Sequence, residues 1–166
     1  MRAKIRYLVF WGTLTSLLCI SVPVSASKTT SDIQMLQNLN SLRAQKGLIP
    51  LVACKFLTKS AQSYAANMAK NNFFGHVGKD GSSPGDRIQS AGYNWKNPLT
   101  KSMVAENIAA GQTTVSQVMD SWKNSPGHYR NMVERVFTHV GFGMAINPSS
   151  KFKIYWVQNF GYGAPC

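Results

Sequence analysis

The hydrophobic pattern of this chain changes its period near the C-terminus. In residues 138–146, "THVGFGMAI", apolar side chains alternate with small or polar ones. The alternation returns in residues 152–160, "FKIYWVQNF", after the turn "NPSSK". A period of two residues is typical of β-strands that bury one face. The two segments therefore predict an antiparallel hairpin.

The chain before this hairpin has helical spacing instead. Apolar residues recur at every third position over residues 33–42, with Ser31 or Asp32 placed to cap the helix and Gly47 placed to end it. Similar spacing predicts two more helices and two short helical turns, over residues 56–71, 114–122, 86–91 and 128–133. Helices first and an antiparallel hairpin last favour an α+β fold over a parallel α/β fold.

Residues 1–26 are interpreted as a secretory signal. Basic residues precede the apolar run "YLVFWGTLTSLLCISV", and small residues follow at Val24 and Ala26. The run is shorter than the roughly 20 apolar residues of a transmembrane helix, and a retained anchor is the alternative. We expect one domain, residues 27–166, secreted from the cell or held in the periplasm or envelope.

Removal of the signal leaves two cysteines, Cys54 and Cys166. An even pair in a secreted protein indicates one disulfide, with two free thiols as the alternative.

The chain is strongly basic, with a formal net charge of +12. The basic residues are dispersed, which argues against nucleic acid as a partner. A dispersed positive surface favours anionic membranes or cell-wall polymers, and a purely solubilising role is the alternative.

Three histidines and six acidic residues leave few ways to build a polar site. Glu106 is the only charge in "VAENIAAG", where a carboxylate needs donors or a cation beside it to keep its pKa from rising. His76 and His128 lie in turn segments and, with Glu106, could hold Zn²⁺ or another divalent cation. The alternative is that each residue is structural. His139, opposite Val140 in the expected strand, is predicted to be exposed and without a role.

Nucleophilic catalysis has little support in the sequence. No phosphate loop or dinucleotide fingerprint is present, and the two remaining cysteines are expected to be paired.

Five blocks in order resemble the CAP superfamily of cysteine-rich secretory proteins, antigen five and pathogenesis-related one proteins. They are "LNSLRAQKGLIPL", "FFGHVGKDGSSPGDRI", "AENIAAG", "VMDSWKNSPGHYRNMV" and "THVGFGMA". The resemblance runs from Ile33 to Phe160 and is greatest to the compact bacterial SCP-like extracellular proteins. It implies a three-layer α-β-α sandwich with a central antiparallel sheet.

The resemblance also implies a cleft of two histidines and two acids, which in some members holds a divalent cation. By motif, His76, Glu106 and His128 match three of these positions. Larger eukaryotic members carry a second glutamate shortly after the tryptophan matching Trp122, and Ser125 occupies that region here. Ser125 is therefore added to the predicted cleft. The missing carboxylate implies that His76 and His128, with Glu106 nearby, hold a cation weakly.

We expect a monomeric, non-enzymatic binding protein. The family resemblance implies that it binds a lipid or sterol-like ligand, or a host or envelope protein. Trp95, Leu99 and Met103 are predicted to form an apolar lip for such a ligand, unless Trp95 packs onto the sheet. The alternatives are a metal-dependent hydrolase or protease in the same cleft, and a purely structural module. No cofactor is expected to be required, with Zn²⁺ or another divalent cation as the candidate.

Overall fold

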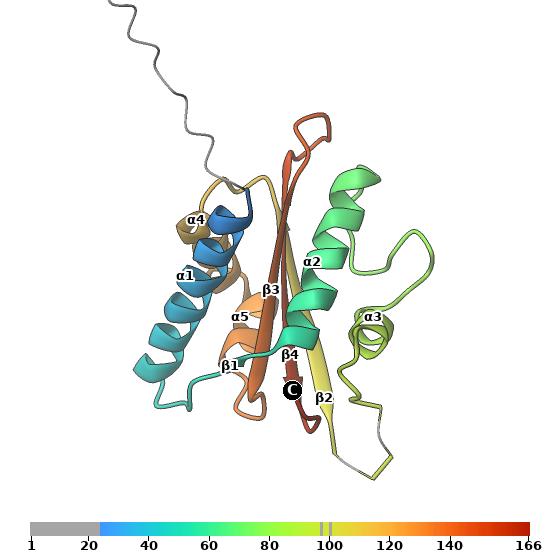
Figure 1. Ribbon diagram of the computed structural model, residues 1–166. Helices are drawn as coiled ribbons and strands as arrows, with labels where there is room; N and C mark the ends of the chain where they lie inside the picture. Colours follow the sequence, from blue (N-terminus) through green and yellow to red (C-terminus); the bar gives the residue numbers. More distant parts are fainter. Residues whose placement is uncertain (1–23, 97, 100) are drawn as a thin grey trace, which may run out of the picture.

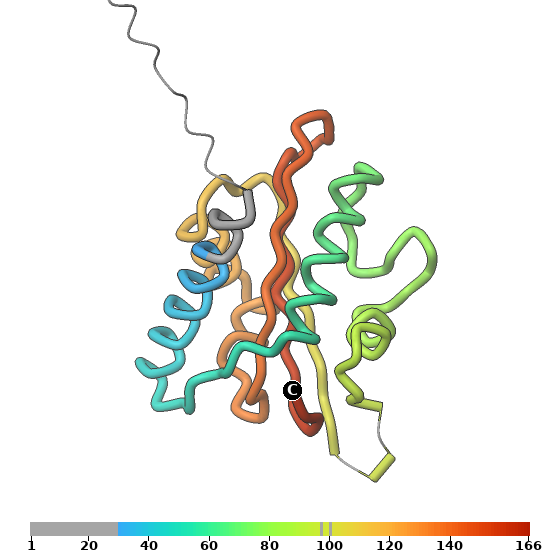
Figure 2. Tube along the Cα trace, in the orientation of Figure 1, coloured from blue at the N-terminus to red at the C-terminus, as the bar shows by residue number. Residues whose placement is uncertain are grey.

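The computed structural model describes residues 24–96, 98–99 and 101–166. It has three layers, with α1, α4 and α5 on one face of a central sheet and α2 and α3 on the other (Figures 1 and 2). The elements in chain order are α1 Val24–Gln45, β1 Val52–Ala53, α2 Lys55–Lys70, α3 Pro84–Ala91, β2 Met103–Ala110, α4 Val115–Lys123, α5 Pro126–Val133, β3 His139–Ile146 and β4 Ile154–Tyr162. The predicted α+β sandwich is confirmed.

The N-terminal helix starts earlier than the sequence pattern predicts. Because α1 begins at Val24, Ser31 and Asp32 lie inside it, and the prediction that one of them caps its start is wrong. No glycine or proline lies between Val24 and Gly47, so nothing in that stretch interrupts a helix. Residues 1–23, most of the predicted signal, lie outside the described residues. Within the described part, no helix has the length and apolarity to cross a membrane.

Among the described residues the sheet has four strands, in the order β1-β3-β4-β2. The predicted β3–β4 hairpin is present, and β2 pairs antiparallel with the other side of β4. The sheet departs from the antiparallel pattern at β1, which pairs parallel with β3 over two residues. Strand β2 was not predicted, because its alanines and Glu106 hide the alternation of apolar residues. It forms because β4 is buried, so the backbone groups along its free side need partners.

Helix α2 packs unusually close to the sheet. An added Cβ at Gly141 or Gly143 of β3 would overlap the backbone of α2, at Leu57–Thr58 and Ala61–Gln62 respectively. Buried alanines on α2, including Ala61 and Ala65, pack on the side chains of β4. Small residues on both elements therefore fix the distance of this layer from the sheet.

The predicted disulfide between Cys54 and Cys166 is present, with a Cα–Cα distance of 5.5 Å across 112 residues. It joins the N-cap of α2 to the last residue of the chain.

Candidate functional site

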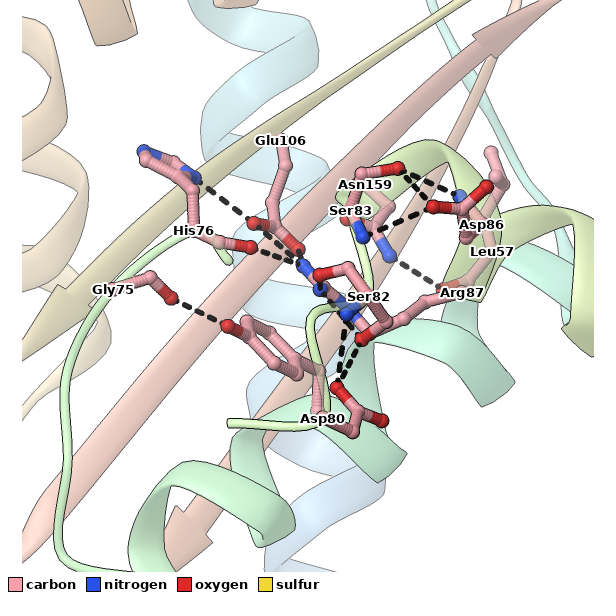
Figure 3. Close-up of polar contacts among 11 residues, drawn as sticks. Leu57, Gly75, His76, Asp80, Ser82, Ser83, Asp86, Arg87, Glu106 and Asn159 are labelled. Atoms are coloured by element: carbon pink, nitrogen blue, oxygen red, sulfur yellow. Dashed lines mark hydrogen bonds and ion pairs between the residues drawn. The ribbon is translucent and has the colours of Figure 1, made fainter. Parts of the chain in front are cut away.

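Glu106 lies on the edge strand β2 and faces α2 and α3, with its side chain only 1% exposed. Its carboxylate accepts hydrogen bonds from Nη2 of Arg87 at 3.1 Å (Oε1) and 2.9 Å (Oε2) (Figure 3). Oε1 also lies 2.9 Å from Nδ1 of His76. The prediction that this carboxylate needs donors or a cation is confirmed, and Arg87 supplies the charge.

Arg87 is a residue of this polar cluster that sequence reasoning missed. Its Nη2 donates to the carbonyl of His76 at 2.9 Å and its Nη1 to the carbonyl of Ser82 at 2.7 Å. Its Cζ lies 3.3 Å from the ring centroid of Tyr64, which is cation–π geometry. The signal that could have found it was the charge that a buried Glu106 requires. The spacing of 19 residues gave no reason to choose Arg87 over other cations.

A capping box sets the position of Arg87. The hydroxyl of Ser83 accepts from the amide of Asp86, and the carboxylate of Asp86 accepts from the amide of Ser83. With Pro84 in the first turn, this cap begins α3 just before Arg87.

His76 lies on the loop after α2 and is the open part of the site, with its side chain 50% exposed. The hydroxyl of Tyr64 donates to the carbonyl of Gly75 at 2.5 Å and holds this loop in place. When neutral His76 donates from Nδ1 to Glu106, its Nε2 carries the lone pair.

His128 approaches from the other face of the sheet, in the first turn of α5. Asn107 donates from Nδ2 to the carbonyl of His128 at 3.1 Å, and Asn131 donates to Oδ1 of Asn107 at 2.8 Å. Burial lowers the pKa of His128, and the charge of His76 lowers it further, so the two imidazoles act on each other electrostatically. Glu106 and Asn107 are consecutive residues whose side chains point to opposite faces of β2. Glu106 contacts the imidazole of His76 on one face, and Asn107 contacts the carbonyl of His128 on the other.

The remaining predicted site residues are Ser125 and the three residues of the predicted lip. Ser125 is the N-cap residue of α5, and its side chain makes no capping hydrogen bond, so its part in the cleft stays a prediction. Trp95 is partly buried, and its Nε1 donates to the carbonyl of Gly85 on α3 at 2.9 Å. Of the three predicted lip residues, Leu99 and Met103 are the exposed ones.

The prediction that His139 is exposed is wrong. His139 is partly buried, with Nδ1 3.2 Å from the hydroxyl of Tyr93 and the two rings packed edge to face. Burial lowers the pKa of His139. The contact joins residues 46 apart in sequence, which strand alternation cannot predict.

The donor set does not match a three-ligand zinc site. Among the described residues, no group of three or more His, Cys, Asp or Glu side chains is arranged to hold a metal ion. The carboxylate of Glu106 is occupied by Arg87 and His76, so a divalent cation bound there would lie beside the guanidinium charge. The imidazoles of His76 and His128 are the donors left for a cation.

Comparison with known proteins agrees with the family resemblance of the sequence motifs. The model of the Cysteine-rich secretory protein (CAP) family matches residues 36–160. The uncharacterized protein YkwD of Bacillus subtilis is 34% identical over 140 residues, which cover 84% of this chain and 49% of YkwD. The uncharacterized membrane protein YlbC of the same species is 29% identical over 133 residues, or 80% of this chain and 35% of YlbC. The chain thus spans half or less of the length of these relatives.

Solved structures show the same fold. An extracellular protein containing an SCP domain from Bacillus anthracis has a TM-score of 0.68 and 26% identity, over 86% of this chain and 45% of that one. An outer surface protein from Borrelia burgdorferi has a TM-score of 0.66 and 23% identity, over 81% of this chain and 95% of that one.

Proposed function

The chain belongs to the cysteine-rich secretory protein (CAP) family, and we propose that it is a non-enzymatic extracellular binding protein. Its ligand lies over the cleft between His76 and His128. The names of two structural neighbours, an extracellular protein and an outer surface protein, support a place outside the cytoplasm. The observation that carries the proposal is the pairing of Glu106 with Arg87.

This pairing argues against Glu106 as the general base of a hydrolase. A carboxylate that accepts hydrogen bonds from a guanidinium on both oxygens is a poor general base, because taking a proton would break a buried ion pair. The guanidinium is also fixed, by Tyr64 and the carbonyls of His76 and Ser82. The polar groups of the cleft are thus preorganised, which lowers the entropy cost of binding.

The two imidazoles then determine which ligand fits. Because the pKa of His128 is lowered, this ring is neutral at neutral pH and offers one N–H donor and one lone pair. A ligand hydroxyl, which both donates and accepts, complements such a pair of rings. We therefore propose a hydroxyl-bearing lipid or sterol-like ligand, with Leu99 and Met103 as candidates for its apolar contacts.

The test is equilibrium binding of labelled cholesterol and labelled palmitate to the disulfide-intact protein. A His76→Ala/His128→Ala variant is expected to lose binding of the hydroxylated probe, and Leu99→Ser/Met103→Ser to weaken both probes. Trp95→Phe is the matched control and is expected to bind normally, since Trp95 packs on α3. Unchanged binding by the double histidine variant, with an unchanged unfolding midpoint, would remove the cleft from the proposal.

We also propose that a divalent cation competes weakly for the same two imidazoles. Titration of Zn²⁺ by calorimetry at neutral pH is expected to show weak one-site binding that the double histidine variant loses. Tight binding would contradict the argument that Arg87 takes the place of the cation.

A hydrolase in the same cleft is the second candidate, and the hydrogen bond between His76 and Glu106 is the observation that favours it. A buried carboxylate bonded to Nδ1 orients an imidazole so that Nε2 can accept a proton. A bound metal, if present, would supply an activated water. Turnover of peptide or ester substrates that His76→Ala abolishes would support this candidate over binding alone.

A further inference from the structure

We propose that one end of the domain is a docking surface for an anionic lipid bilayer. This surface, the basic pole, combines the end of α2, the loop after it and the β3–β4 turn. It consists of Lys70, Phe74, Val77, Lys79, Lys151 and Lys153, all of which are exposed. Figure 1 shows the end of α2 and the β3–β4 turn at the same end of the molecule.

Direct contacts make these distant segments one surface. The amide of Lys151 donates to Oδ1 of Asn72 at 2.7 Å, and Asn147 donates to the carbonyl of Ala69 at 2.8 Å. These pairs are 79 and 78 residues apart in the sequence. The rings of Phe74 and Phe152 lie 5.8 Å apart across the same junction. The pole is therefore held in shape before it meets a partner.

Exposed apolar side chains lie among the lysines of the pole. Phe74 is 44% exposed and Val77 63% exposed. Nζ of Lys151 lies 5.2 Å from the ring centroid of Phe152, and Nζ of Lys79 lies 5.5 Å from that of Phe73. Apolar side chains beside the ammonium groups of lysines are the composition of surfaces that sit at the boundary of headgroups and acyl chains.

The positive charge of the pole favours an anionic bilayer as its partner. Asp80 follows the pole in sequence, and its Oδ1 accepts from the amide and the hydroxyl of Ser82. The four lysines thus outweigh the neighbouring acid. Each lysine near an anionic membrane strengthens binding by about fivefold, and the apolar side chains add a contribution that salt does not screen.

Docking at this pole is separate from ligand binding in the cleft, because neither His76 nor His128 is part of it. Val77 follows His76 directly in the sequence, so docking would hold the cleft at the membrane surface. The two proposals can therefore fail independently.

The experiment uses the protein in the form that the cell produces. It measures how much of this protein cosediments with lipid vesicles. One set contains equal parts phosphatidylcholine and phosphatidylglycerol, and the other contains phosphatidylcholine alone. We expect binding to the anionic set, weakened at least about 25-fold by Lys70→Glu/Lys151→Glu. The matched control is Lys46→Glu/Lys55→Glu, which makes the same change of charge just after the end of α1 and at the start of α2. These two element ends lie at the end of the molecule opposite the pole (Figure 1). This control is expected to weaken binding far less.

Phe74→Ala tests the apolar part and is expected to weaken the binding that persists at high salt, with Val77 left as the remaining apolar contact. Equal losses in the two lysine variants would overturn the proposal, because net charge alone would then explain binding. Full binding by Phe74→Ala at high salt would overturn it too, because the salt-resistant binding would then not come from the apolar side chains of the pole. The His76→Ala/His128→Ala variant is expected to bind vesicles normally, and a loss there would show that the cleft, not the pole, meets the membrane.

Discussion

The guanidinium of Arg87 and the carboxylate of Glu106 form a buried ion pair that joins α3 to the edge strand β2. The two side chains are 13% and 1% exposed, so water screens their interaction little. Arg87 also donates to the carbonyl of His76 and so holds the loop that carries this residue.

Replacing Arg87 with methionine is expected to lower the free energy of unfolding by about 3 to 5 kcal/mol, because Glu106 would stay buried without a counter-charge. Urea unfolding measures the change. The double variant Arg87→Met/Glu106→Gln should recover much of the loss, since it buries no net charge. A double variant as unstable as the single one would mean that packing against Tyr64, not charge, is what Arg87 supplies.

Stability is expected to fall as the solution is acidified below the ordinary histidine pKa of 6.5. The pKa of His128 is lowered in the folded state, so between the folded and unfolded values the unfolded chain binds more protons. The contribution of His128 to the free energy of unfolding is therefore complete above pH 6.5. It is lost as the pH falls from there through the pKa of His128 in the folded state. Unfolding curves from about pH 8 to about pH 5 test this, and His128→Asn should flatten the dependence.

His139 shifts in the same direction, because burial lowers its pKa as well. His139→Asn should therefore remove a second part of the acid dependence. An unaltered pH profile in both variants would contradict these assignments.

The Cys54–Cys166 disulfide closes a loop of 112 residues. Chain entropy predicts that losing it costs about 4 to 5 kcal/mol, because the unfolded chain becomes freer. The Cys54→Ala/Cys166→Ala variant should show this loss in thermal or urea unfolding. Reductant should destabilise the native protein and leave the double variant unchanged.

Gly143→Ala is expected to destabilise the protein by about 3 kcal/mol, because its Cβ would overlap the backbone of α2 and push that helix off the sheet. Gly127→Ala is the control, since a Cβ there meets no atom within 4 Å. It should be neutral, or stabilising by up to about 1 kcal/mol, because alanine is the better helix former. Equal effects in the two variants would show that α2 moves without cost.

Much of the fold followed from the sequence because its elements have strong local patterns. The predicted helix over residues 56–71 is α2, and Thr114 caps α4 as expected, accepting from the amide of Gln117. The alternating segments form β3 and β4. Of the residues that the motifs predicted to form a cleft, the structure holds Glu106 and His76 in contact.

The sequence alone predicted features set by neighbouring residues, such as the cap of α4 and the strand alternation, and the even number of cysteines predicted one distant contact, the disulfide. Which other distant groups meet depends on tertiary packing. β2 is a strand because β4 needs a partner, Glu106 pairs with Arg87 because α3 packs beside β2, and His139 is partly buried because Tyr93 lies against it. Each of these contacts joins segments far apart in sequence, and local periodicity carries no information about which of them will pack together.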